Sequence, residues 1–236
     1  MKTIDLKIFE AYHPATLSIM KLLFKLVAIL ALIFFGGCEE DDVPAIGADL
    51  SLFEQVGEEP FAAIAPSVEI DYWELLSYSP DVSQSPMPLH RHGTKCARAT
   101  NQQTCEQSFD SLISEEGGFR EVCNWVCFYY YIKYQQGNEA FLITRLQDLK
   151  EFLGDIDAES DALLWAYGNG YYTNSDKKET AAIRKLVDGY ELLALKNVSM
   201  CTPYQNNRFY LHINAQGAIK ILGEEVYHKD ANDCYD

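Results

Sequence analysis

Six cysteines in the middle and C-terminal parts of the chain constrain its fold more than any other sequence feature. They are Cys96, Cys105, Cys123, Cys127, Cys201 and Cys234. An even number of cysteines in a protein exported to an oxidising compartment predicts a framework of disulfide bonds. Six cysteines allow many different pairings, and the reach of the chain is the first guide to them.

Cys96 and Cys105 lie on either side of a polar loop, residues 97–104. A loop of this length can close on itself, so we predict a local bridge between the two cysteines. We expect this bridge to close the shortest loop in the protein and therefore to contribute least to stability.

Cys123 and Cys127 are only four residues apart. On one continuous strand their Cα atoms would lie about 13 Å apart, which is too far for a disulfide bond, whereas on a helix they would lie about 6 Å apart, which permits one. The residues after Cys123 favour a strand, so we expect each of the two to pair with Cys201 or Cys234. The competing prediction is a zinc site made of four thiolates, although the sequence has no Cys-x-x-Cys motif.

The N-terminus indicates how the chain reaches an oxidising compartment. Lys21 and Lys25 precede an uncharged run of 13 residues, 26–38, which is shorter than the ~20 residues of a membrane-spanning helix. A basic region followed by a short apolar stretch is typical of a secretory signal. Residues 35–38 (Phe-Gly-Gly-Cys) resemble the lipobox of bacterial lipoproteins, although its first position is usually Leu. The resemblance implies that residues 1–37 are removed and that Cys38 binds membrane lipid.

Two other interpretations of this segment stay open. It could be an uncleaved membrane anchor, or the signal of a secreted protein in which Cys38 is incidental. Residues 1–19 contain Asp5 and Glu10, which are unusual in a signal peptide. Because Met20 begins a more typical signal, we hypothesise that translation starts there.

The residues that follow Cys38 are strongly acidic. Residues 39–42 (Glu-Glu-Asp-Asp) resemble the export tract of some surface lipoproteins, which implies a lipid-anchored protein displayed on the outer membrane. From residue 39 to residue 90 the chain has 12 acidic residues, no Lys or Arg, and six of its eight prolines. We therefore expect residues 38–67 to form a tether. A disulfide-braced domain would follow over 68–236, with its regular core from about residue 121.

The charge of the chain excludes some classes of partner. The formal net charge is -16, and the 15 basic and 33 acidic residues from Cys38 onward give -18. Such a protein repels phosphate backbones, so we do not expect it to bind nucleic acid.

The pattern of apolar residues from about position 121 predicts an α+β fold. Residues 127–134 and 140–143 favour a strand hairpin. Two helices should follow, one capped by Thr144 and Gln147 and ended by Gly154, the other capped by Asp157. Four strands then form an antiparallel meander over 183–187, 190–198, 208–214 and 218–227, with turns at Asp188-Gly189 and at 214–217. We expect one antiparallel sheet with the helices on one face.

His90 and His92 are the best candidates for metal ligands. Two histidines at i and i+2 of an extended segment point to the same side, and His212, His228 or a carboxylate could add a third ligand. The alternative is a loop bounded by Pro and Gly, because the sequence context of a known metalloenzyme is missing. We therefore predict no cofactor.

A polar row on one predicted strand is a second candidate site. Arg208, Tyr210 and His212 alternate with apolar residues, so they should face outward as a recognition patch or supply a general base. The alternative is an ordinary solvated sheet face. The chain also has more phenol rings than a core easily absorbs, and these could stack on sugars or anchor proteins: Tyr129, Tyr130, Tyr131, Tyr134, Tyr171 and Tyr172. The alternative, which we favour, is that they form the half-buried surface of a strand that alternates between two faces.

The sequence contains no motif that identifies a reaction. The lipase elbow, the zinc-protease helix motif and the nucleotide-binding glycine loops are all missing. We therefore expect a lipid-anchored envelope protein that binds a polysaccharide or an envelope protein, or serves as an accessory component, without catalysis. The alternative is an envelope hydrolase with a His-containing, metal-dependent site.

Overall fold

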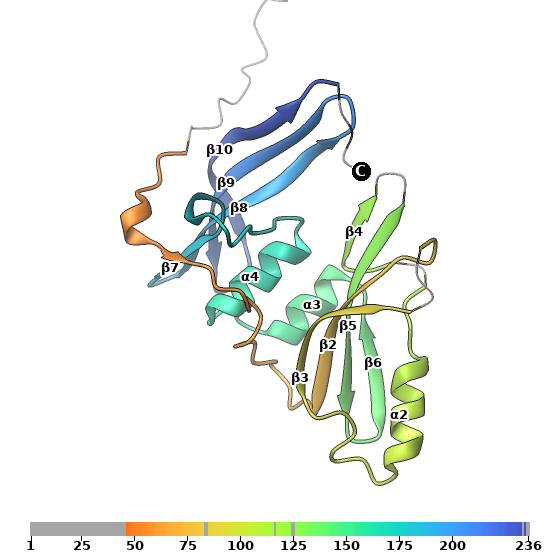
Figure 1. Ribbon diagram of the computed structural model, residues 1–236. Coiled ribbons are helices and arrows are strands. Elements are labelled where there is room, and N and C mark those ends of the chain that lie inside the picture. The colour runs from red at the N-terminus through yellow and green to blue at the C-terminus, as the bar shows by residue number, and fades with distance from the viewer. Residues whose placement is uncertain (1–45, 83–84, 116, 124–125, 233, 235–236) are drawn as a thin grey trace, which may run out of the picture. The chain divides into compact units, whose positions relative to one another are not determined.

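The computed structural model describes residues 46–82, 85–115, 117–123, 126–232 and 234 (Figure 1). The signal peptide, Cys38 and the acidic tract lie outside these residues, so the expectations about them stay predictions. In the described part of the chain, no helix is long and apolar enough to span a membrane.

The described strands form two antiparallel sheets, which we call the C-terminal sheet and the N-terminal sheet after the position of most of their strands. The C-terminal sheet has the order β1-β7-β8-β9-β10. Its strands are β1 (Glu54–Gln55), β7 (Ala182–Leu186), β8 (Gly189–Met200), β9 (Tyr204–Asn214) and β10 (Ile219–Asp230).

The N-terminal sheet has the order β3-β2-β5-β4, and β6 also pairs with β5. Its strands are β2 (Tyr72–Tyr78), β3 (Met87–Gly93), β4 (Arg120–Cys123), β5 (Cys127–Gln136) and β6 (Glu139–Ile143). The helices are α2 (Gln102–Ser111), α3 (Leu146–Leu153) and α4 (Glu159–Gly168), with short 3-10 turns η1 (Leu50–Leu52) and η2 (Lys178–Thr180).

The predicted α+β class is confirmed, and so is the C-terminal meander of β7 to β10. The arrangement differs from the expectation because the hairpin β5–β6 lies in a separate sheet, where β5 pairs with β2. Within the described residues, α3 and α4 share one hydrophobic core with the inward faces of both sheets (Figure 1). Trp73 of β2 meets Phe152 of α3 at 5.9 Å between ring centroids, and Tyr171 after α4 meets Phe209 of β9 at 5.2 Å.

Alternation along the meander strands explains why they face the helices as they do. Leu192 of β8 and Leu211 of β9 are fully buried partners, whereas the adjacent pair, Leu193 and Tyr210, points to the opposite face. Both predicted hairpins are present, but the first turn lies at Val187 and Asp188 and not at Asp188-Gly189, because Gly189 begins β8 and pairs with Leu186. Gly189 has φ +148°, and a Cβ there would lie 2.0 Å from the Ile213 carbonyl oxygen. In the second turn the Gly217 amide donates to the Asn214 carbonyl over 2.9 Å.

The helix ends were only partly predicted. Gly154 ends α3 as expected, with φ +70°. The expected cap by Thr144 is wrong, because α3 begins after Arg145, which pairs with Asp148 at 2.7 Å. The expected cap of α4 by Asp157 is also wrong: the cap position is Ala158, whose amide donates to the Asp161 carboxylate over 3.1 Å.

The segment expected to be a tether carries buried side chains. Phe53, Val56 and Ile64 are 4%, 5% and 3% exposed. Phe53 packs with Ala182 and Leu193 on the outer face of the C-terminal sheet, and the Val56 amide donates to the Ala181 carbonyl over 2.9 Å. Residues 46–56, which we call the strap, therefore cover part of that face.

The six cysteines form three disulfide bonds. The predicted Cys96–Cys105 bridge is confirmed. The prediction that Cys123 and Cys127 each pair with a distant cysteine is wrong, as is the four-thiolate zinc site. Cys123 ends β4 and Cys127 begins β5, so the two face each other across a hairpin with Cα atoms 4.1 Å apart.

The remaining bridge joins Cys201 to Cys234, whose Cα atoms are 4.0 Å apart. Cys201 follows β8, and the two cysteines also form an isolated antiparallel backbone bridge. This bond ties the segment after β10 back to the end of β8.

Asp161 gives the fold a pH dependence that can be tested. Asp161 is 1% exposed. Burial raises the pKa of its carboxyl group from 3.8 to about 6, and the nearby charge of Asp157 acts in the same direction. The folded state therefore holds the proton more tightly than the unfolded state does. The protonated carboxyl group therefore stabilises the folded state fully below about pH 4, and this stabilisation is lost as the pH rises to about 6.

Replacing Asp161 by asparagine should remove this loss of stability at higher pH, because asparagine does not ionise. Its amide oxygen can still accept a hydrogen bond from the Ala158 amide. We expect the free energy of unfolding of Asp161→Asn, relative to the parent, to rise by up to about 3 kcal/mol between pH 4 and pH 7. Urea unfolding at several pH values measures this. Glu159→Gln, an exposed carboxylate in the same helical turn, is the control and should leave the pH curve unchanged. Parallel curves for Asp161→Asn and the parent would contradict the prediction.

Candidate functional site

The two candidate metal ligands lie on β3 against a tryptophan. In the strand register, His92 is opposite Trp73 and His90 is opposite Leu75. The ring centroids of His90 and His92 lie 5.0 Å and 6.3 Å from that of Trp73. Burial and the neighbouring His92 lower the pKa of His90. In the described structure its Nε2 atom is buried without a hydrogen-bond partner.

Neither His212 nor His228 completes a metal site with this pair, because both belong to the C-terminal sheet, on β9 and β10. Across the described ranges, one group of three ligand-type side chains converges: Glu121, Cys123 and Cys127, with ligand atoms within 4.8 Å of one another. The two sulfur atoms are bonded to each other, so they are not thiolates that could bind a metal.

The polar row on β9 faces outward as predicted, but each of its members has an internal partner. The Tyr210 hydroxyl donates to Glu191 over 2.7 Å. The Arg208 guanidinium pairs with Glu225, and His212 lies 3.4 Å from Asp188. The strap covers this face in part, since Phe53 meets the Tyr210 ring at 6.0 Å. These contacts favour the interpretation as a structural sheet face.

A cluster of aromatic rings around Arg120 is the most distinctive polar feature of the described chain. The Arg120 guanidinium carbon lies 4.0 Å from the ring centroid of Tyr167 on α4 and 5.5 Å from that of Tyr130 on β5. Its Nη1 atom donates to the carbonyl oxygens of Tyr167 and Tyr171 at 3.1 and 3.2 Å. Burial lowers the pKa of this arginine below its ordinary value. These contacts hold the cation at the junction of β4, β5 and α4.

Arg120 lies in the wall of a pocket with a volume of about 240 Å³. We call it the β4–β8 pocket, after the strands that supply most of its lining. The residues around it are Arg120, Glu121, Val122, Cys123, Gly170, Tyr172, Lys196, Asn197 and Met200. It holds two cations, one carboxylate, one amide and one phenol within a chain whose overall charge is strongly negative.

Internal contacts fix the position of the polar groups in this pocket. The Lys196 ammonium donates to the Asn169 carbonyl over 3.2 Å and lies 4.6 Å from the centre of the Tyr171 ring. The hydroxyls of Tyr172 and Tyr204 donate to the Asn197 side-chain oxygen over 3.1 and 3.3 Å. The pocket wall is therefore preorganised.

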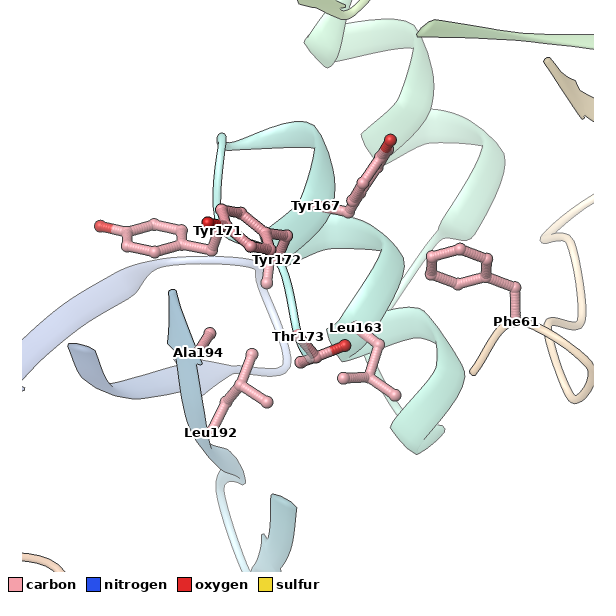
Figure 2. Close-up of a pocket in the computed structure, with 9 residues that line it drawn as sticks. Phe61, Leu163, Tyr167, Tyr171, Tyr172, Thr173, Leu192 and Ala194 are labelled. Carbon is pink, nitrogen blue, oxygen red and sulfur yellow. The ribbon is translucent and has the colours of Figure 1, made fainter. Parts of the chain in front are cut away.

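A second, smaller cavity lies beside α4, and Figure 2 shows the side chains around it. Its volume is about 20 Å³, with Leu163 and Tyr167 of α4, Phe61, and Leu192 and Ala194 of β8 among its lining. This is space for about one water molecule. The lining is mostly apolar, so we interpret this cavity as a packing gap.

His90 also borders an open groove of about 610 Å³, together with Glu58, Glu59, Arg91 and Tyr167. Another open hollow of about 650 Å³ lies around Ser114, Glu115 and Gly118. Neither gathers more than one permanently charged cation. The β4–β8 pocket combines a smaller volume with two cations and an aromatic ring, so we take it as the candidate site.

Sequence reasoning identified only the aromatic part of this site. Tyr130, Tyr171 and Tyr172 belong to the surplus of phenol rings noted above. Arg120 and Lys196 were not predicted as site residues, because 76 positions separate them and neither lies in a recognisable motif. A surplus of aromatic rings in an acidic chain was the one signal that pointed to this region.

No family model, curated protein or solved structure matches the chain. The chemistry of the site is therefore inferred from its own side chains. Guanidinium and ammonium groups bind anions, an amide bonds to hydroxyl groups, and a phenol ring offers a flat surface for stacking. Such groups recognise a polar ligand without having to transfer a proton.

Proposed function

We propose that this chain is a lipid-anchored, non-enzymatic binding protein of the cell envelope. The observation that carries the proposal is the β4–β8 pocket, where Arg120, Lys196 and Asn197 are held in place by contacts to the protein itself. Preorganised groups of this kind suit binding, because little freedom is lost when the ligand arrives. A polysaccharide is the favoured ligand, and an envelope protein is the other partner considered.

The lipid anchor rests on the sequence of residues 20–38. A short apolar run behind two lysines and the Phe-Gly-Gly-Cys motif support cleavage before Cys38. The acidic tract behind Cys38 supports display on the outer membrane. The strongly negative charge disfavours attraction to an anionic lipid surface, so lipid on Cys38 would be the means of attachment.

The alternative of an envelope hydrolase gains no support from the described histidines. His90 and His92 lie against Trp73, and His212 faces Asp188 in the other sheet.

Mass spectrometry of the N-terminal peptide of the native protein tests the anchor. We expect Cys38 to be the first residue and to carry two or three acyl chains, since two buried chains give stable attachment whereas one alone is marginal. The Cys38→Ser variant should no longer be found in the membrane fraction. An unmodified Cys38, or a mature N-terminus elsewhere, would disprove the lipoprotein proposal.

Binding itself is tested with the full chain on immobilised polysaccharides, both acidic and neutral. Saturable retention on at least one of them, lost after the protein is unfolded, would support the proposed binding function. Hydrolysis of the polysaccharide during the assay would overturn the non-enzymatic part of the proposal.

A further inference from the structure

We propose that the β4–β8 pocket binds a carboxylated sugar, such as a uronic acid unit at the end or along the chain of a polysaccharide. This inference rests on the proposed binding function and adds the chemical class of the ligand. It depends on three features of the pocket: two cations with unused donors, one carboxylate at the wall, and a size that admits a small ligand.

The cations are the first feature. Among the described atoms, only Nη1 of Arg120 has hydrogen-bond partners, and Nε is buried with none. Lys196 uses one donor on the Asn169 carbonyl, which leaves two N–H groups of its ammonium for a ligand. The buried Nε is out of reach of a ligand, so an anion at this wall would bind through Nη2 of Arg120 and the ammonium of Lys196, with charge-assisted hydrogen bonds.

The carboxylate of Glu121 limits the charge of that anion. Glu121 lines the same pocket, and the protein as a whole carries a net charge of -16. A sugar carboxylate has one negative charge, whereas a phosphate monoester carries about 1.5 to 2 at neutral pH. Two cations and one carboxylate leave a local charge of about +1, which matches a single carboxylate better than a phosphate.

The remaining lining suits the body of a sugar. The pocket volume of about 240 Å³ is below the range of about 300–1,000 Å³ typical of drug-sized ligands. One sugar unit is a ligand of the appropriate size. Tyr172 supplies a ring face for its C–H groups, and the Asn197 amide nitrogen supplies a donor for a hydroxyl group.

The test is a calorimetric titration of the full chain with three probes: glucuronate, glucose and inorganic phosphate. We expect glucuronate to bind at least about tenfold more tightly than either of the others, because the ionic hydrogen bonds depend on a single carboxylate. Equal affinity for glucose would show that the cations are not used. Equal or tighter binding of phosphate would show that the pocket takes any anion. Either result, or no binding of glucuronate, would overturn the inference.

Asn197→Asp is the sharpest variant, because the aspartate oxygen can still accept from the hydroxyls of Tyr172 and Tyr204 while adding a negative charge to the pocket. We expect at least about tenfold weaker glucuronate binding. The matched control is Asn138→Asp, an exposed residue whose side-chain oxygen accepts from the Thr100 amide at 2.9 Å, and it should bind as the parent does.

Lys196→Gln removes a pocket cation and keeps a group that can donate to the Asn169 carbonyl. Its control is Lys177→Gln, since Lys177 makes a similar pair of contacts with the Tyr227 hydroxyl and ring outside the pocket. Only the first variant should weaken glucuronate binding. If the full chain and Asn197→Asp are retained equally on an acidic polysaccharide, the binding function stands and the assignment to this pocket fails.

Discussion

Replacing Phe53 by alanine is expected to lower the free energy of unfolding by about 3–5 kcal/mol, the usual cost of truncating a buried phenylalanine. The side chain is 4% exposed and packs on Ala182 and Leu193. The ring also meets Tyr210 edge-on at 6.0 Å and lies 5.1 Å from the Arg184 guanidinium carbon. Loss of the ring would leave a cavity between the strap and the sheet that small neighbours cannot fill.

Urea unfolding of the full chain, followed by tryptophan fluorescence and far-UV circular dichroism, measures the change. Leu52→Ala is the control: this neighbouring residue is 57% exposed, so its truncation should change stability by no more than about 0.5 kcal/mol. A loss below about 1 kcal/mol for Phe53→Ala would mean that the strap is held only loosely, as the tether prediction had it.

The strap escaped prediction because its buried residues follow no regular period. Phe53 and Val56 are three positions apart, and Ile64, which lies beyond the strap, follows eight positions later, in a segment that has acidic residues and no Lys or Arg. Composition averages over such a segment and indicates an extended chain. What fixes the strap is the apolar outer surface of β7 and β8, which the sequence of the strap itself does not reveal.

Local patterns predicted the elements whose partners are near in sequence. The alternation of residues 208–214 and the turn at 214–217 are confirmed, and the hairpin before Gly189 is present with its turn one residue earlier than predicted, since each is decided by a few neighbouring side chains. The partition into two sheets was not predictable in this way. It depends on β5 pairing with β2, more than 50 positions earlier in the chain, and strand propensity carries no information about such a partner.

The candidate site lies beyond local patterns for the same reason. Arg120 reaches its tyrosines only after β4, β5 and α4 have assembled, and Lys196 comes from a strand of the other sheet. For the histidine pair, the local pattern was predicted correctly but the long-range contact was not. Its spacing was interpreted correctly, because His90 and His92 do share one face of a strand, but that face meets Trp73.

The error about Cys123 and Cys127 also has a local cause. The aromatic run after Cys127 favours a strand, and extending that strand back to Cys123 put the two sulfur atoms out of reach of each other. The strand in fact begins at Cys127, and β4 ends at Cys123, so the chain reverses between them. This correction changes which bridge closes the shortest loop, and with it the expected order of their contributions to stability.

Removing the Cys201–Cys234 bond, in the double variant Cys201→Ala/Cys234→Ala, is expected to lower the free energy of unfolding by about 4 kcal/mol. The bond joins residues 33 positions apart, so it restricts the unfolded chain more than the other two bridges, which span 9 and 4 positions. Both sulfur atoms are removed so that no free thiol can exchange with the remaining bridges.

The matched control is Cys123→Ala/Cys127→Ala, for which the same entropy relation gives a loss of about 2 kcal/mol, with the Cys96–Cys105 bond between the two. Unfolding of the three double variants in urea, under non-reducing conditions, ranks the bonds. Equal losses for all three would show that the bridges act through native contacts and not through the unfolded chain. If removing Cys123–Cys127 lowers the free energy of unfolding more than removing Cys201–Cys234 does, the β4–β5 hairpin is the part of the protein that depends most on its disulfide bond. That hairpin forms part of the wall of the β4–β8 pocket.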